Sequence, residues 1–473
     1  MNNLIATTCK GIVFLAAAYL VLSSWFLRPG PEVLASDAEQ NLAMAYNLRH
    51  HAVFSTDTDR APNALRPSRE REPLPVLILA GHMWAMDSQL GNQPFEALLA
   101  GPNVQLLKYS NVFWGAVLVG TMFLTMRRLR MPPWTTALVL VLTLIPLDKY
   151  HNTLYTEPAA AALIALVSYL ALRSFQNPGR FNFFLFGVVS GLLCLTKASF
   201  FYVSIVLLSI YFVYAWTQSV DRKQRFSAYG YATLMIAGLL LIVGPWILRN
   251  QIQFGSPELA GRGGEVLMER AIKNGMSSEE YAGTFYAYSP RVMKKLIAAI
   301  TPYKLEDIEA GGRLERLERD ANDRQDRQAI AEERYGDIIS YHHIARGLYF
   351  SNLRAFERAN HVNPQAAADA KTKEAALAII KSHPTDHVAM TLPFMWRGAP
   401  FMFPLLMFML YYAWLRRDSA IAAYVLPSIG LIAFYAALTH FIPRYSLPNM
   451  PVAAVCFTLL LFRGFKKQKA SAS

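Results

Sequence analysis

The chain has 473 residues, of which 53% are apolar and 17% are charged. A soluble chain carries about 25% charged residues, so this composition excludes an ordinary soluble protein and indicates one that lies largely within a membrane. The net charge of +13 is spread over short basic clusters between apolar runs, which excludes a nucleic-acid-binding protein with one basic face.

Ten apolar runs are candidates for membrane spans, since a transmembrane helix needs about 20 mostly apolar residues. In chain order they cover residues 8–27, 104–126, 134–148, 158–172, 182–196, 200–217, 228–248, 391–414, 419–438 and 447–463. We therefore predict an all-α polytopic membrane protein with about ten transmembrane helices. The first run has an alternative interpretation as a cleaved signal peptide, which the weakly basic start of the chain disfavours.

The basic residues of the short loops predict the orientation, because lysine and arginine are retained on the cytoplasmic side. Alternate short loops carry clusters such as Arg127–Arg130 and Arg222–Arg225. The opposite short loops carry only Lys149, Lys197 and Arg444. We expect both termini in the cytoplasm, the protein in the cytoplasmic membrane, and the segments 28–103 and 249–390 on its outer face.

Both outer segments contain helical patterns. In the first, the amphipathic stretches Ala38–Leu48 and Leu74–Met86 predict helices that lie along the membrane interface. In the second, 305–335 is rich in charged residues and leucine, and 364–380 is rich in alanine and lysine. Mixed charges at helical spacing are typical of solvated helix faces, so we predict a helical extracytoplasmic segment there.

Few acidic residues lie outside these two segments, and one of them, Glu157, is a candidate functional residue. The four are Asp148, Glu157, Asp221 and Asp418. Glu157 opens a predicted transmembrane helix, where a carboxylate either stabilises the helix N-terminus or has a function. We favour a function, because other polar residues are predicted on the same side of the membrane.

These other residues are acids and cations near the outer ends of spans. Asp37 and Glu39 begin a helical pattern shortly after the first span. The cations are Lys197, Arg249 and Arg444. Taken singly, each cation is explained as a residue at the membrane interface whose charged end extends into water. Together, against the positive-inside bias, they predict an anionic ligand at the outer face.

Acids and cations at the outer face suit one kind of reaction. The outer compartment generally lacks nucleotide sugars, so sugars arrive there attached to a lipid phosphate. Departure of the phosphate calls for cations that stabilise the developing charge. The acceptor hydroxyl is a weak nucleophile and calls for a carboxylate base. The residues therefore predict transfer of a sugar from a lipid-phosphate donor.

Several short motifs occur in an order that resembles a known family. They are Ser36–Glu39 through Ala45–Leu48, Arg71–Pro75, Tyr155–Pro158, Pro245–Trp246 with Arg249–Asn250, and Arg444–Tyr445 with Leu447–Pro448. In these motifs the chain resembles the GT-C fold glycosyltransferases that use polyprenyl-phosphate sugars, in the family 39-like branch of the protein O-mannosyltransferases and the lipid A aminoarabinose transferase.

The resemblance implies an inverting enzyme with a catalytic base in the first outer loop, which by position is Asp37. Many members have an adjacent Asp-Glu pair, whereas Ala38 separates Asp37 from Glu39 here, so Glu157 competes with Glu39 for the role of second acid. The acceptor would be a hydroxyl of a lipid, a glycan or a protein.

The resemblance also implies where the donor binds. The candidates for holding the departing polyprenyl phosphate are Arg249, Lys197, Arg71 and Arg444. Gly261–Gly264, which contains Arg262, resembles a stretch in some bacterial members. Its glycines would let the backbone approach a phosphate, and a plain turn is an equal alternative.

The same resemblance divides the chain into three parts. Residues 1–248 would form the catalytic transmembrane module, with spans one to seven, the first outer loop 28–103 and a lateral groove for the polyprenyl chain. The extracytoplasmic segment 249–390 and the C-terminal transmembrane helices of 391–473 would shape acceptor choice.

Metal use stays open, because some GT-C enzymes bind a divalent metal ion. His383, Asp386 and His387 are candidate ligands, but a helix start explains them better. The three cysteines lie in or beside apolar runs and predict neither disulfides nor a cysteine metal site.

Two neighbouring functions compete with a polyprenyl-phosphate transferase. One is an O-antigen ligase-like enzyme with a diphosphate donor, which calls for more outer arginines. The other is a lipid-linked sugar transporter or a non-catalytic subunit of an envelope glycan assembly system. A transporter predicts polar residues deep within spans, whereas the ionisable residues here lie at the outer ends.

Overall fold

The computed structural model of the protein describes residues 33–218, 222–261 and 263–463. Within these ranges the regular structure is helical, and the one β-type pairing is an isolated bridge between Val33 and Ala100. The prediction of an all-α protein is therefore confirmed for the described residues. The predicted first span, 8–27, lies outside them.

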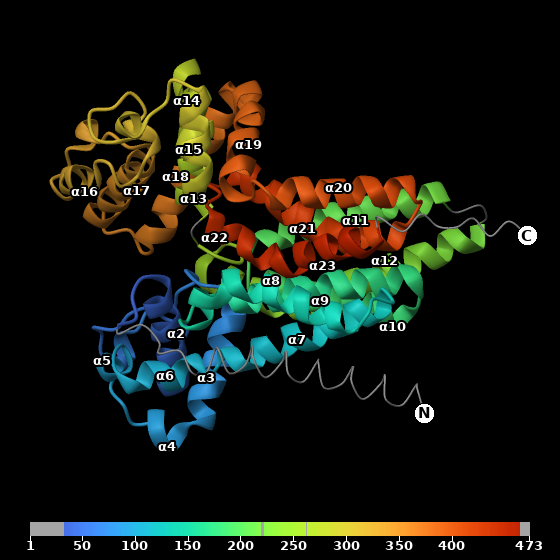
Figure 1. Ribbon diagram of the computed structural model, residues 1–473. Helices are drawn as coiled ribbons and strands as arrows, with labels where there is room; N and C mark the ends of the chain where they lie inside the picture. The colour runs from blue at the N-terminus through green and yellow to red at the C-terminus, as the bar shows by residue number, and fades with distance from the viewer. Residues whose placement is uncertain (1–32, 219–221, 262, 464–473) are drawn as a thin grey trace, which may run out of the picture. The chain divides into compact units, whose positions relative to one another are not determined.

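The chain divides into two compact units, each with its own packing (Figure 1). The first unit extends to Leu259 and also contains Phe401–Leu431 and the chain from Ser446 onward. Its helices up to Leu259 are α2 (Asp37–His51), α3 (Pro73–Ala85), α4 (Asp87–Leu90), α5 (Phe95–Leu98), α6 (Pro102–Lys108), α7 (Asn111–Arg128), α8 (Trp134–His151), α9 (Glu157–Gln176), α10 (Arg180–Cys194), α11 (Ser199–Gln218) and α12 (Arg222–Phe254).

The second unit comprises Ala260–Pro400 and Ile432–Tyr445. Its α-helices are α13 (Gly263–Ala271), α14 (Ser278–Ala287), α15 (Arg291–Ile300), α16 (Asp323–Ala331), α17 (Tyr341–Arg358), α18 (Pro364–Ser382) and α19 (Pro384–Gly398). The C-terminal helices α20 (Met402–Leu415), α21 (Ser419–Leu438), α22 (Pro443–Ser446) and α23 (Met450–Arg463) follow. The unit begins at Ala260, after α12, which continues unbroken past Arg249 to Phe254.

Several described helices are long and apolar enough to cross a membrane. Five qualify alone: Pro102–Arg128, Glu157–Gln176, Ser227–Phe254, Ser419–Leu438 and Pro443–Phe462. The pair α19 and α20 qualifies as a sixth only when the two are counted together. The predicted runs 134–148, 182–196 and 200–217 are helices, but each is a shorter apolar one. The chain is thus a helical protein with several candidate membrane spans, and ten spans stay a prediction.

The predicted helices of the first outer loop are present as α2 and α3. They pack on each other around a core that includes Leu42, Met44, Val76 and Met83, each with no exposed surface. On α3 the buried positions recur at helical spacing, from Pro73 through Val76 and Leu79 to Met83, as expected for one apolar face. This small core fixes the start of α2 relative to the chain that precedes α3.

Helices α10 and α12 pack very closely because glycines lie where they cross. An added Cβ at Gly187 of α10 would lie 2.8 Å from the carbonyl carbon of Met235, and one at Gly238 of α12 would lie 2.9 Å from the amide nitrogen of Val188. At Gly191 a Cβ would lie 2.7 Å from Ile242 Cβ. The spacing of Gly187 and Gly191 by four residues is the small-residue pattern that brings transmembrane helices together.

Helix α12 is the longest helix in the described part of the chain, with 33 residues and an internal proline, Pro245. Proline has no N–H, so the carbonyl of Leu241 loses its helical partner at this point. Helices α7, α8, α9, α10, α12 and α23 run side by side in Figure 1, and neighbouring members are in contact.

The second unit matches the sequence prediction in part. The run 364–380 forms α18, as predicted. Residues 305–335 form only α16 and short 3-10 turns rather than long helices. Local ion pairs stabilise the turns of this stretch, as between Arg313 Nε and Asp307 Oδ1, which are 2.8 Å apart. Buried Tyr286, Leu314 and Tyr341 form a core beneath it.

Candidate functional site

A short segment, Ser68–Leu74, connects three of the predicted site elements; it belongs to the stretch predicted to be the first outer loop. Arg71 forms an ion pair with the carboxylate of Asp37 and donates from Nε to Gln40 Oε1 at 2.9 Å. The carbonyl of Ser68 accepts a hydrogen bond from Arg249 Nη1 at 3.1 Å. The segment thus joins the start of α2 to the C-terminal end of α12.

The other end of the segment contacts the turn between α10 and α11, which carries Lys197. Glu72 Oε1 accepts from the amide of Ala198 at 3.4 Å, and the amide of Leu74 donates to the carbonyl of Leu195 at 3.0 Å. The structure therefore places Asp37, Arg71, Lys197 and Arg249 around one segment, as residues of a common cluster.

Asp37 is the first residue of α2 and its side chain is about one-fifth exposed, at 19%. The preceding residue, Ser36, has φ 58° and ψ −127°, a conformation that favours glycine. Non-glycine residues in such conformations cost of order 1–3 kcal/mol and are concentrated at functional sites. Glu39 lies in the same first turn and forms no ion pair with a described residue.

Glu157 opens α9 and is nearly inaccessible, with 1% of its surface exposed. Lys197 Nζ lies 3.6 Å from its Oε1. A buried carboxylate needs such a partner, because an isolated buried charge is strongly destabilising. The geometry favours a role for Glu157 in holding Lys197, and the greater exposure of Asp37 favours that residue for contact with an acceptor.

Arg249 differs from the other cations of the cluster, because it has no carboxylate partner among the described residues. Its Nη1 also donates to Asn250 Oδ1 at 2.8 Å. Its guanidinium carbon lies 4.6 Å from the ring centroid of Trp246 and 5.1 Å from that of Phe254. Its positive charge is therefore available to an anion, whereas Arg71 and Lys197 are each paired with an acid.

Arg69, which the sequence analysis did not single out, lies beside this group. It is buried, with 7% of its surface exposed, and pairs with Glu258 at 3.6 Å. Its guanidinium carbon lies 5.4 Å from the ring of Phe254, which Arg249 also contacts. The feature of the sequence that points to Arg69 is the run of alternating charges Arg69–Glu72, to which it belongs.

Two other predicted phosphate-binding residues lie in other parts of the chain. Arg444 belongs to the second unit, in α22, where its guanidinium carbon lies 5.9 Å from the ring of Tyr445. Arg262 lies outside the described residues. Their roles stay predictions.

The candidate metal ligands do not form a metal site in the described part of the chain, where no cluster of at least three suitable side chains is present. His383 Nδ1 lies 3.3 Å from Asp386 Oδ2. His387 is buried, and its Nδ1 lies 3.2 Å from Asn274 Oδ1 instead.

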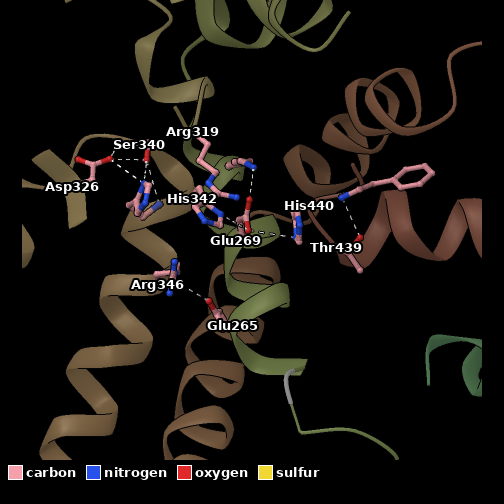
Figure 2. Close-up of polar contacts among 12 residues, drawn as sticks. Glu265, Glu269, Arg319, Asp326, Ser340, His342, Arg346, Thr439 and His440 are labelled. Atoms are coloured by element: carbon pink, nitrogen blue, oxygen red, sulfur yellow. Dashed lines mark hydrogen bonds and ion pairs between the residues drawn. The ribbon is translucent and has the colours of Figure 1, made fainter. Parts of the chain in front are cut away.

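The second unit contains a buried polar cluster that the sequence analysis missed (Figure 2). Glu269 on α13 lies between two histidines: its Oε2 is 3.0 Å from His342 Nδ1 and 3.4 Å from His440 Nδ1. Its Oε1 is 3.5 Å from Lys273 Nζ. Burial opposes its charge, but His440, Lys273 and His342 outweigh burial and hold the pKa of Glu269 well below its usual range.

Burial also shifts the pKa values of the residues that pair with Glu269. It lowers the pKa of Lys273 to about 8 and that of His440 to about 4. Arg397 donates to the carbonyl of His440 at 3.2 Å, which fixes the loop after α21. In the sequence, only the adjacent histidines at 342 and 343 point to this buried cluster, because the residues that pair with them are distant along the chain.

An apolar cavity of about 1080 Å³ lies in the first unit, at the opposite ends of the helices from the charged cluster. Its lining includes Phe175, Phe186, Tyr211, Trp414 and Arg417. On α9, Phe175 is 18 residues from Glu157, which is about 27 Å along a helix. The cavity is therefore separate from the candidate site.

Comparison with models of known protein families finds no match to this chain. Comparison with curated proteins finds no significant match either.

Proposed function

We propose that the protein is a GT-C fold membrane glycosyltransferase. It moves a sugar, with inversion, from a polyprenyl-phosphate donor to a hydroxyl of a lipid, glycan or protein acceptor at the outer face of the cytoplasmic membrane. The observation that supports the proposal best is that one short segment, Ser68–Leu74, contacts both an accessible carboxylate and an arginine without an acidic partner. The carboxylate is that of Asp37, which pairs with Arg71, and the arginine is Arg249, which donates to the carbonyl of Ser68.

In this proposal Asp37 accepts the proton of the acceptor hydroxyl as its oxygen attacks the anomeric carbon. The bond between that carbon and the phosphate oxygen breaks on the opposite face, and polyprenyl phosphate leaves with the electron pair. Arg249 stabilises the negative charge that develops on the leaving group. Arg71 orients Asp37, while Glu157 holds Lys197 close to the same segment.

Release of polyprenyl phosphate tests this function. Purified protein in lipid nanodiscs is supplied with a mixed pool of polyprenyl-phosphate sugars and an envelope extract as the source of acceptors. The variant Asp37→Asn should lower release by about 10²- to 10⁴-fold, the usual contribution of a general base. Asp87→Asn is the matched control, because Asp87 also pairs with an arginine of the first outer loop, Arg49, but is exposed.

The competing functions give other results in the same assay. A transporter or non-catalytic subunit would bind the donor and release no lipid phosphate, with or without Asp37. A diphosphate-using ligase would release lipid diphosphate from a diphosphate donor and leave the monophosphate donors unchanged. Either result would refute the proposed donor chemistry.

A further inference from the structure

Asn250 follows Arg249 directly and is completely buried. Both ends of its amide are used: Oδ1 accepts from Arg249 Nη1 at 2.8 Å, and Nδ2 donates to the carbonyl of Glu258 at 2.7 Å. An asparagine amide that is bonded at both ends has a fixed orientation, since reversing it would leave both partners unsatisfied. Asn250 therefore presents its oxygen to Arg249.

The Nη1 amine of Arg249 has two hydrogens, and both are engaged. One bonds Asn250 Oδ1, and the other bonds the carbonyl of Ser68 at 3.1 Å. Nε and Nη2 have no hydrogen-bond partner among the described residues. These two nitrogens form the edge with which a guanidinium binds two oxygens of one phosphate at once.

Aromatic rings restrict the guanidinium further. Trp246 and Phe254 lie 4.6 and 5.1 Å from its central carbon, and Phe54 lies at 5.8 Å. Trp246 is itself fixed, because its Nε1 donates to the carbonyl of Leu259 at 3.0 Å. The plane of Arg249 is thus set by its neighbours before any ligand arrives, which lowers the entropy cost of binding.

We infer that Asn250 is a positioning residue that holds Arg249 by its Nη1 amine, so that the Nε and Nη2 edge receives the phosphate of the lipid donor. This inference rests on the proposed function, and it names both the atoms that meet the phosphate and the residue that sets their direction. Asn250 itself touches no donor atom in this arrangement.

Equilibrium binding of polyprenyl phosphate to the full-length protein in nanodiscs tests the inference, together with donor kinetics. Asn250→Leu should weaken binding and raise the donor KM by about tenfold, within the range of measured couplings, and should also lower kcat, because Arg249 stabilises the charge that develops on the leaving group. Asn47→Leu is the matched control, because Asn47 is also buried, with 4% of its surface exposed, and its side chain bonds the carbonyls of Ser55 and Asp57. It should leave binding unchanged.

A double-mutant cycle separates positioning from general damage. If Asn250 acts through Arg249, then adding Asn250→Leu to Arg249→Ala should cause no further loss of affinity. Additive losses, or equal effects of Asn250→Leu and Asn47→Leu, would overturn the inference.

Arg249→Lys provides a second test that does not depend on folding of the asparagine variant. Lysine keeps the charge but cannot bond Ser68 and Asn250 while offering two parallel donors to a phosphate, so affinity should still fall about tenfold. Affinity equal to that of the parent protein would refute the two-nitrogen edge. Competition by inorganic phosphate reveals whether the edge recognises phosphate alone or needs the lipid.

The outcomes distinguish this inference from the proposed function. A parent protein that binds polyprenyl phosphate through Arg249 and Asn250 but transfers no sugar would support the inference and refute the transferase. A parent protein that releases lipid phosphate without any dependence on Asn250 would do the reverse. A parent protein that does not bind polyprenyl phosphate would overturn the inference.

Discussion

The crossing of α10 and α12 predicts that two glycines of the same helix respond in opposite ways to an added methyl group. At Gly238 the new Cβ would lie 2.9 Å from the amide nitrogen of Val188, against a favourable separation of about 3.5–4.0 Å. Backbone atoms cannot rotate aside, so Gly238→Ala must separate the helices by up to about 1 Å. At Gly230, which also lies on α12, an added Cβ has no atom outside its own stretch of helix within 4 Å, so the methyl group meets open space.

The expected energies follow from two opposing terms. Overpacking costs about 1–3 kcal/mol, and removing glycine from a helix interior gains about 0.8–1.0 kcal/mol. Gly238→Ala should therefore lose up to about 2 kcal/mol net, whereas Gly230→Ala should be neutral or stabilising by up to about 1 kcal/mol. Gly187→Ala should behave like Gly238→Ala, because it faces the carbonyl group of Met235.

Thermal unfolding in one detergent, followed by the fluorescence of a thiol-reactive probe that labels buried thiols such as Cys194 and Cys456 when they become exposed, provides the assay. The midpoint should fall for Gly238→Ala and stay equal or rise for Gly230→Ala. Equal midpoints for the two variants would refute the reasoning, since the glycine at the crossing would then have no steric role.

Three other predictions concern single sites. Ser36→Gly should stabilise the protein by about 1–3 kcal/mol, the cost of its backbone conformation, and a lower midpoint for unfolding would contradict that strain. Glu157→Gln should destabilise by about 3–5 kcal/mol, because it leaves Lys197 buried without its partner; adding Lys197→Met should recover much of the loss, and additive losses would show that the pair is not coupled. The third prediction concerns pH: burial lowers the pKa of His440 to about 4, so as pH falls below about 6.5 the unfolded chain takes up its proton first. Stability should then fall between about pH 6.5 and 4, by up to about 3 kcal/mol from this group, and His440→Gln should flatten the fall. A pH profile of unfolding midpoints that is identical in the variant would exclude His440 as the cause.

Local patterns in the sequence predict the helices well, because they depend on the spacing of apolar residues. The starts of α2 and α3 fall within one residue of the predicted stretches. The charged run 305–335 was predicted less well, because its side chains pair locally, as Arg313 does with Asp307, and stabilise turns instead of a long helix.

The candidate site shows what one sequence does not reveal. Asp37 and Arg71 could each be selected as site residues, but their ion pair is a tertiary contact across 34 positions. Glu269 was not selected at all, because no motif near it in the sequence indicates its partners. Its histidine partners follow 73 and 171 positions later, at His342 and His440.

The length of α12 has a mechanical consequence. At about 1.5 Å per residue its 33 residues extend about 50 Å, whereas the hydrocarbon layer is about 30 Å thick. The helix is thus longer than a single span requires, and Pro245 interrupts its hydrogen bonds one turn before Arg249. Before the proline the helix is locked to α10 at Gly238, and after the proline it is tied to Ser68 and to Glu258. The two halves of one helix are therefore anchored by different parts of the chain, and each half has its own support.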